Sequence, residues 1–500
     1  MPDHQIEHQP DERVGEHEGG HEGGHEGVMS LSLLLVLGVT VSFVAGRLLR
    51  RLAPTLRAFS GPEYIVLGVL LGPHVLGVFT PDAVLALNPL LSTVVGLIGL
   101  MLGLNAREVV QDIEIALAGA LMCIAVTVVI AGVSLAFLQW GIPPPFESTV
   151  VLEPLAVWGG NIYSLWLTDT WLWLALMLGA AGSVSSYAVV GAIASLLEVT
   201  RQPLVKLMAG LARLSQMMGV VIAGLAMLGS RATLATESSL SIVEWGLVGF
   251  VVSGVCGLVF GLFIGSERDS TRIYLATIGV VVFATGIGTA MGVTPMFVNL
   301  TVGIVVALTS PHAEQLKKAL AGLREPLFIL CFLFAGALWS PVSALLWVLP
   351  LVFLAASIAA KSMFATIAAR IFIDDVPSGV NVGRGLVSQG VISIAIAVGV
   401  AQRFPEHAGL VLTTVISATL LSSILGPRWI RAVLGDAGLV RADGGHRRVV
   451  ARPMADAADT SVHVDADDHV DADDHVDADD HVDADDHVAV DADQAGGRAS

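Results

Sequence analysis

The chain has 500 residues, of which 54% are hydrophobic and 14% charged, and its mean hydropathy is +0.76. This balance excludes an ordinary water-soluble domain and indicates a protein that crosses a membrane many times. The net charge of −18 is concentrated in two tails, because residues 1–27 carry −7 and residues 435–500 carry −13. The 18 acids and 20 bases of residues 28–434 leave the transmembrane domain nearly neutral, and nothing in it indicates a nucleic-acid partner.

Both tails place histidines among acids in short repeats. The first contains HEGGHEGGHEG, and the second repeats DADDHV. Dense charge and few large apolar residues predict that both tails are disordered. Imidazole and carboxylate groups are ligands for Zn²⁺, Ni²⁺ and Cu²⁺, so weak metal binding is one interpretation, and a solvated acidic bristle is the other. The candidate ligands are His17, His21, His25, His463, His469, His475, His481 and His487.

Apolar runs between helix breakers predict an all-α polytopic membrane protein with about 13 transmembrane helices. The expected limits are 28–49, 62–79, 88–104, 113–137, 170–198, 203–229, 240–265, 272–291, 294–310, 325–339, 341–372, 380–402 and 408–433. The segment 141–169 is apolar but rich in proline and tryptophan, which favours an interfacial loop.

The distribution of Lys and Arg predicts the orientation in the membrane. Alternate loops carry 14 basic residues on one side and two, Arg231 and Arg403, on the other. The positive-inside rule then places the N-terminus outside and the C-terminus in the cytoplasm of a cell (inner) membrane. The first helix is followed by its positive charge and lacks a cleavage site, so we expect an uncleaved anchor.

Four motifs, in order along the chain, carry a family resemblance. They are YIVLGVLLGPHVLGVFTPD (64–82), EPLFILCFLFAGAL (325–338), AAKSMFATIAARIF (359–372) and GRGLVSQGVISIAIAVGV (383–400). Together they resemble the second, tenth, eleventh and twelfth helices of the monovalent cation:proton antiporter family, in its Kef-type branch. The resemblance implies a sodium–proton antiporter-like fold with an inverted repeat. Helices 4–6 and 11–13 would form a mobile core, helices 1–3 and 8–10 a dimerisation platform, and helix 7 the link.

Two small, polar interruptions agree with that fold on independent grounds. The segments GSVSSYAVV (182–190) and GLVSQGVIS (385–393) are each in the second helix of a three-helix group. Transporters with inverted repeats bind their substrate where two such helices are broken near the midplane. Close packing of small residues is the structural alternative for a single segment. Two segments at matching positions favour broken helices that cross.

The sequence departs from the family at the positions that usually bind the ion. By resemblance, the acidic pair of helix 6 aligns with Ser215 and Gln216, and the Thr-Asp of helix 5 aligns with Ser185 and Ser186. The family's lysine is kept as Lys361. Hydroxyl and amide oxygens can ligate a cation, but they do not titrate near neutral pH as a carboxylate does. The pocket is therefore expected to work without a fixed negative charge.

Three interpretations of such a pocket stay open. In the first, Na⁺ or K⁺ is exchanged for protons by an elevator-type movement, with Lys361 as a desolvated amine that carries the proton. In the second, Lys361 and Arg213 make the cavity positive, and the substrate is an anion or an organic acid. In the third, the protein does not transport and is a membrane scaffold whose tails respond to metal ions.

The basic residues also have structural interpretations. Arg213 could snorkel to the cytoplasmic interface, and Lys361 could cap the carbonyls of a broken helix. Ser388 and Gln389, in the second broken helix, are the further candidate ligands. The expected partners are a monovalent cation, protons, the lipid bilayer and a second copy of the chain. Neither catalysis nor a resident cofactor is expected.

Overall fold

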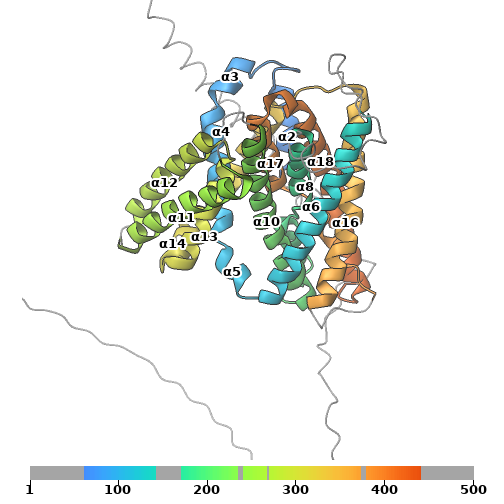
Figure 1. The fold of residues 1–500 in the computed structure, drawn as a ribbon. Coiled ribbons are helices and arrows are strands. Elements are labelled where there is room, and N and C mark those ends of the chain that lie inside the picture. The colour runs from blue at the N-terminus through green and yellow to red at the C-terminus, as the bar shows by residue number, and fades with distance from the viewer. Residues whose placement is uncertain (1–60, 142–169, 235–239, 267–269, 373–378, 441–500) are drawn as a thin grey trace, which may run out of the picture. The chain divides into compact units, whose positions relative to one another are not determined.

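The computed structural model describes residues 61–141, 170–234, 240–266, 270–372 and 379–440, which are helical almost throughout (Figure 1). The predicted first helix (28–49) and residues 142–169 of the predicted interfacial loop lie outside these ranges. So do the two tails, apart from residues 435–440. All the helices described below belong to one compact unit, Met1–Arg448.

The helices follow one another with short connections. The first half contains α2 (Pro62–Leu71), α3 (Pro81–Ala86), α4 (Asn88–Gly103), α5 (Ala106–Val110), α6 (Ile113–Gly141), α8 (Thr170–Ser183), α9 (Tyr187–Leu196) and α10 (Pro203–Leu234). The second half contains α11 (Ile242–Ser266), α12 (Ser270–Met291), α13 (Pro295–Thr309), α14 (Ala313–Ala321), α15 (Arg324–Ala337), η3 (Ala344–Val348), α16 (Leu349–Phe372), η4 (Val382–Leu386), α17 (Val391–Arg403), η5 (Pro405–His407) and α18 (Ala408–Asp436).

The described part of the chain has eight helices long and apolar enough to span a membrane, or nine if the bent pair α14–α15 is one span. α13 and α17 are apolar but shorter. The predicted limits agree closely for several helices: the 113–137 span is α6, and the 272–291 span is α12. The all-α membrane fold is confirmed, and the count of about 13 helices stays a prediction.

Proline and capping residues explain where several helices begin. α3 begins at Pro81 after Thr80, whose hydroxyl accepts from the Ala83 N–H at 3.2 Å. α13 begins at Pro295 after Thr294, whose hydroxyl accepts from the Met296 N–H at 3.3 Å. Proline suits the first helical turn because its φ is preset and its missing N–H has no partner there.

Most helices pack within one of two groups. The core group consists of α6, α8, α9, α10, α16, η4, α17 and α18. The platform group consists of α2, α4, α12, α13 and α15, and α11 packs against both α13 and α10. This grouping corresponds to the core, platform and linking helix that the family resemblance implies.

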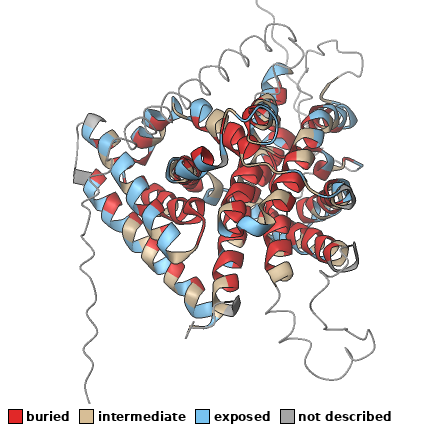
Figure 2. Ribbon diagram, turned by 90° about the horizontal axis from the view of Figure 1, so that it is seen from above, coloured by how far each residue is buried: buried red, intermediate tan, exposed pale blue. Residues whose placement is uncertain are grey.

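Small residues allow the platform helices to approach closely. A Cβ at Gly68 on α2 would lie 2.1 Å from the Leu333 carbonyl oxygen, and one at Gly336 on α15 would lie 2.3 Å from that of Ile65. Only glycine fits at these two positions, as in small-residue contacts between membrane helices. Large apolar side chains such as Leu262 on α11 and Phe283 on α12 are instead exposed, which suits a hydrocarbon environment. Figure 2 colours the ribbon by burial, with exposed residues in pale blue.

Candidate functional site

Two interrupted segments of the core group meet. Residues 184–186 separate α8 from α9, and residues 387–390 separate η4 from α17. The Ser186 N–H donates to the Ser388 carbonyl oxygen at 2.7 Å, so the interruptions are in direct contact. A Cβ at Gly390 would lie 3.0 Å from the Ser186 hydroxyl, which shows how tightly they cross. The two segments that the sequence analysis selected therefore form one place in the structure.

Lys361 lies on one side of the first interruption. It is on α16, its side chain is fully buried, and its Nζ donates to the Val184 carbonyl oxygen at 2.6 Å. Two serines satisfy the carbonyls just before it: Ser357 Oγ donates to Gly182 at 3.0 Å, and Ser393 Oγ donates to Ala181 at 2.8 Å. The C-terminal end of a helix carries partial negative charge, so the amine and hydroxyls neutralise the end of α8.

Lys361 has no acidic partner within the described part of the chain. The ion pairs found there join Arg213 and Lys317 to Glu108, and His407 approaches Glu406 at 4.0 Å. The described segments therefore place no carboxylate in an ion pair with Lys361, as the sequence predicts. The carbonyl-capping interpretation of Lys361 matches the geometry directly.

The sixth predicted helix is α10, and its two candidate residues, Ser215 and Gln216, form hydrogen bonds with Ser185 in the first interruption. Ser215 Oγ accepts from the Ser185 N–H at 3.0 Å, and Gln216 Nε2 donates to the Ser185 carbonyl oxygen at 3.0 Å. The Ser185 hydroxyl is buried and has no hydrogen-bond partner among the described residues. Ser185, Ser215 and Gln216 thus form one connected cluster of neutral polar groups.

Gln389 extends this cluster from the second interruption. It is buried, its N–H donates to Ser422 Oγ at 3.1 Å, and its Oε1 accepts from Thr419 Oγ1 at 3.4 Å. Its Nε2 has no partner among the described residues. The Ser388 hydroxyl makes a long contact, 3.5 Å, to the Gln389 carbonyl oxygen.

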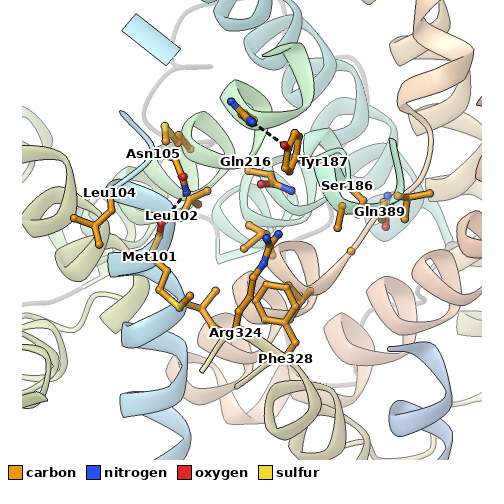
Figure 3. A pocket seen from close by; sticks show the side chains of 18 of the residues that line it. Met101, Leu102, Leu104, Asn105, Ser186, Tyr187, Gln216, Arg324, Phe328 and Gln389 are labelled. Atoms are coloured by element: carbon orange, nitrogen blue, oxygen red, sulfur yellow. Dashed lines mark hydrogen bonds between the residues drawn. The ribbon is translucent and has the colours of Figure 1, made fainter. Parts of the chain in front are cut away.

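The cluster borders a cavity of about 470 Å³ between the two helix groups. Ser186, Gln216 and Gln389 line it from the core group, while side chains of α4, α5, α14 and α15 line it from the opposite side. Figure 3 shows Gln216, Tyr187 and Ser186 on one side, Met101, Leu102 and Asn105 on another, and Arg324 with Phe328 closing the view. An ion that reached the interruptions from this cavity would meet protein on several sides.

Arg213 is also in the cavity wall and is held there. Its guanidinium donates to Glu108 on α5 and to the Tyr187 hydroxyl at 2.7 Å, and it stacks 4.2 Å from the centre of the Tyr187 ring. Lys317 on α14 donates to the other oxygen of Glu108. The hydrogen bonds fix the position of the guanidinium, and the snorkelling interpretation of Arg213 stays a prediction.

Glu108 is the functional candidate that the sequence analysis missed. It supplies the acid that the sequence around Arg213 lacks, yet it precedes Arg213 by 105 residues and follows Arg107, which was counted with the cytoplasmic loops. No local pattern links the two positions. Thr419 on α18 was missed for a similar reason, since one hydroxyl in an apolar helix gives no signal of its own.

The candidate tail ligands lie outside the described residues, and metal binding by the tails stays a prediction. Within the described segments, no group of three or more His, Cys, Asp or Glu side chains is placed to hold a metal ion. The three cysteines lie in helices and have free thiols. Cys123 and Cys331 are buried, and Cys256 is partly buried.

Interrupted helices in contact beside a cavity, within a bundle of membrane-spanning helices, are the arrangement expected of a secondary transporter.

Comparison with known proteins identifies the class more closely. The family described as "Sodium/hydrogen exchanger, transmembrane" matches residues 38–435. A similar fold is found in the sodium proton antiporter MjNhaP1 from Methanocaldococcus jannaschii at pH 8, with a TM-score of 0.55 and 15% identity, covering 82% of this chain and 99% of that one. A search of curated proteins gives no match. The chain belongs to the sodium/hydrogen exchanger family, which consists of cation:proton antiporters and not of enzymes. The resemblance seen in the four motifs is confirmed.

Proposed function

We propose that the protein exchanges a monovalent cation, Na⁺ or K⁺, for protons across a cell membrane. Its family membership supports antiport in general. The observation that carries the specific mechanism is that a cluster of neutral polar groups and a buried amine bond to adjacent residues of one helix interruption. Ser215 and Gln216 bond to Ser185, while Lys361 bonds to the adjacent Val184.

Neutral oxygens are the proposed cation ligands. The Ser185 hydroxyl is buried and has no partner in the described segments, so an arriving ion would satisfy it. The Gln216 amide uses its nitrogen on Ser185, which leaves its oxygen available on the cavity side. Oxygen donors of this type suit Na⁺ and K⁺, which prefer hard ligands.

Lys361 is the proposed proton carrier. A cation bound at Ser185 and an ammonium bound at the preceding carbonyl would repel each other strongly in a site with little water. Arrival of the cation would therefore favour loss of the proton from Nζ, and return of the proton would favour release of the cation. The neutral amine keeps two N–H groups, so it can still donate to Val184 after the exchange.

Movement of the core group against the platform group is the proposed route between the two sides of the membrane. The cavity lies where such a movement would open and close access, and Glu108 joins Arg213 of the core to Lys317 on α14 across it. We place the protein in the inner membrane as a homodimer, with its N-terminus outside. These assignments follow the basic loops and the family resemblance.

The experiment that tests this function uses everted membrane vesicles and a pH-sensitive dye. Addition of Na⁺ or K⁺ should dissipate a proton gradient in vesicles that contain the full chain. Lys361→Ala should abolish the response, whereas Lys318→Ala, on an exposed lysine outside the cavity, should leave it unchanged. An unchanged response in Lys361→Ala would remove the lysine mechanism, and no response to either cation would remove cation exchange.

A further inference from the structure

We propose that the cavity binds a small monovalent anion, such as chloride, which supplies the negative charge that the family's helix-6 acid would provide. The binding site itself stands on the geometry below. Its role in transport rests on the proposed function.

Two helix N-termini open onto the same cavity. Ser186, Tyr187, Ala188 and Val189 form the start of α9, and Gly390, Val391 and Ile392 form the start of α17; all of them line it. Neither helix has a side-chain cap. The first N–H groups of a helix have no partner within it, and together with the helix dipole they present partial positive charge. Two such ends facing one space form an anion site of the kind found at helix N-termini.

A buried donor without an acceptor lies at the same place. Gln389 immediately precedes the start of α17, it lines the cavity, and it is only 1% exposed. Its Nε2 has no acceptor among the described residues. A buried amide N–H that lacks a partner carries a desolvation penalty, and an anion in the cavity would remove that penalty.

The charges around the cavity have the matching sign. Arg213, Lys317 and Arg324 line it, and Glu108 is the one acidic side chain among the lining residues. Three basic groups and one acid leave a formal charge of +2 before the two helix ends are counted. Glu108 already bridges Arg213 and Lys317, so it occupies part of the basic surface that an added anion would otherwise use.

The same arrangement explains how a cation could bind without a fixed acid. A neutral oxygen cage that holds Na⁺ or K⁺ in a partly desolvated site has no countercharge of its own. An anion between the starts of α9 and α17 would lie next to Ser186 and Gln216, close to the proposed cation ligands. The anion would then serve the cation as the family's carboxylate does, and its release would weaken cation binding.

Binding is tested with the purified full chain in detergent. The unfolding temperature is measured while chloride replaces gluconate at constant cation concentration. A ligand that binds the native state raises the unfolding temperature, and the rise grows with the logarithm of ligand concentration above the Kd. Wild type should show this rise, and Gln389→Leu should lose it. The control Gln402→Leu, near the other end of α17, should keep it.

A chloride-dependent rise of equal size in wild type and Gln389→Leu would overturn the site, as would no rise in wild type. If Gln389→Leu does not fold, Arg213→Gln takes its place, with loss of the rise again expected. The role in transport is measured separately in proteoliposomes. Exchange should fall several-fold in gluconate, and Gln216→Asp should make it independent of chloride. Absence of all exchange would overturn the proposed function but not the binding site, whereas chloride-independent exchange in wild type would overturn the role.

Discussion

The two ends of the interrupted helices are treated in opposite ways. At the C-terminal end of α8, Ser393, Ser357 and Lys361 donate to the carbonyls of residues 181, 182 and 184, respectively. At the starts of α9 and α17, no side chain caps the N–H groups, and both open onto the cavity. The protein thus satisfies its partial negative charges internally and leaves its partial positive charges accessible.

The family resemblance gives this difference a meaning, because it implies that the chain keeps the basic part of the transport site and lacks the acidic part. By the family resemblance, Lys361 corresponds to the family's lysine, and Ser186, Ser215 and Gln216 stand where the family would carry acids. A site that contains a buried amine and no carboxylate needs a negative charge from another source whenever a cation occupies it. The following substitutions alter one end at a time.

The largest effect on stability is expected at the C-terminal end of α8, where side chains donate to the carbonyls. Lys361→Met keeps most of the side-chain volume but leaves the Val184 carbonyl oxygen buried without its donor. Loss of a hydrogen bond from a charged group should lower the free energy of unfolding by about 2–3 kcal/mol. Ser357→Ala removes a neutral donor from Gly182 and should cost about 1 kcal/mol. Chemical denaturation in detergent compares the two, and equal losses would show that the ammonium has no special weight at this end.

A smaller effect on stability, of opposite sign, is expected at the uncapped start of α9. Ser186 is the N-cap residue of α9 and makes no side-chain cap, so Ser186→Asp should cap the helix and neutralise its dipole. Stability should rise by about 1 kcal/mol, and the chloride-dependent rise in unfolding temperature should shrink. Ser195→Asp, near the exposed C-terminal end of the same helix, is the matched control and should destabilise it slightly. Equal effects of both substitutions would contradict an uncapped, electropositive start of α9.

The sequence predicted the spans well because length and hydropathy act locally. The run at 203–229 became α10, Pro203–Leu234, with Pro203 at its start, and the polar segment at 182–190 contains the gap at residues 184–186 between α8 and α9. The neutral candidates Ser185, Ser215 and Gln389 lie at or next to the two interruptions, and their role as ligands stays a prediction.

The charges of the cavity could not be predicted in the same way. Glu108, Arg213 and Lys317 come from three separate helices, and their pairing depends on how α5, α10 and α14 pack. Periodicity reports which face of a helix is apolar, but it does not report which distant side chain faces a given arginine. The missing acid of α10 was therefore visible in the sequence, and the acid that pairs with Arg213 was visible only in the fold.

The smallest effect on stability is expected at Glu108. The same residue gives the sharpest test of anion binding at the uncapped starts of α9 and α17. Its two ion pairs are partly exposed, with about a third of each side chain accessible, so Glu108→Gln should change the free energy of unfolding by less than about 1 kcal/mol. The neutral amide no longer offsets Arg213 and Lys317, so chloride should bind more tightly, by about tenfold for a gain of ~1.4 kcal/mol. Chloride titration of the unfolding temperature measures the change, with Glu314→Gln on the exposed face of α14 as control. Weaker chloride binding in Glu108→Gln would mean that Glu108 positions the basic groups and does not compete for them.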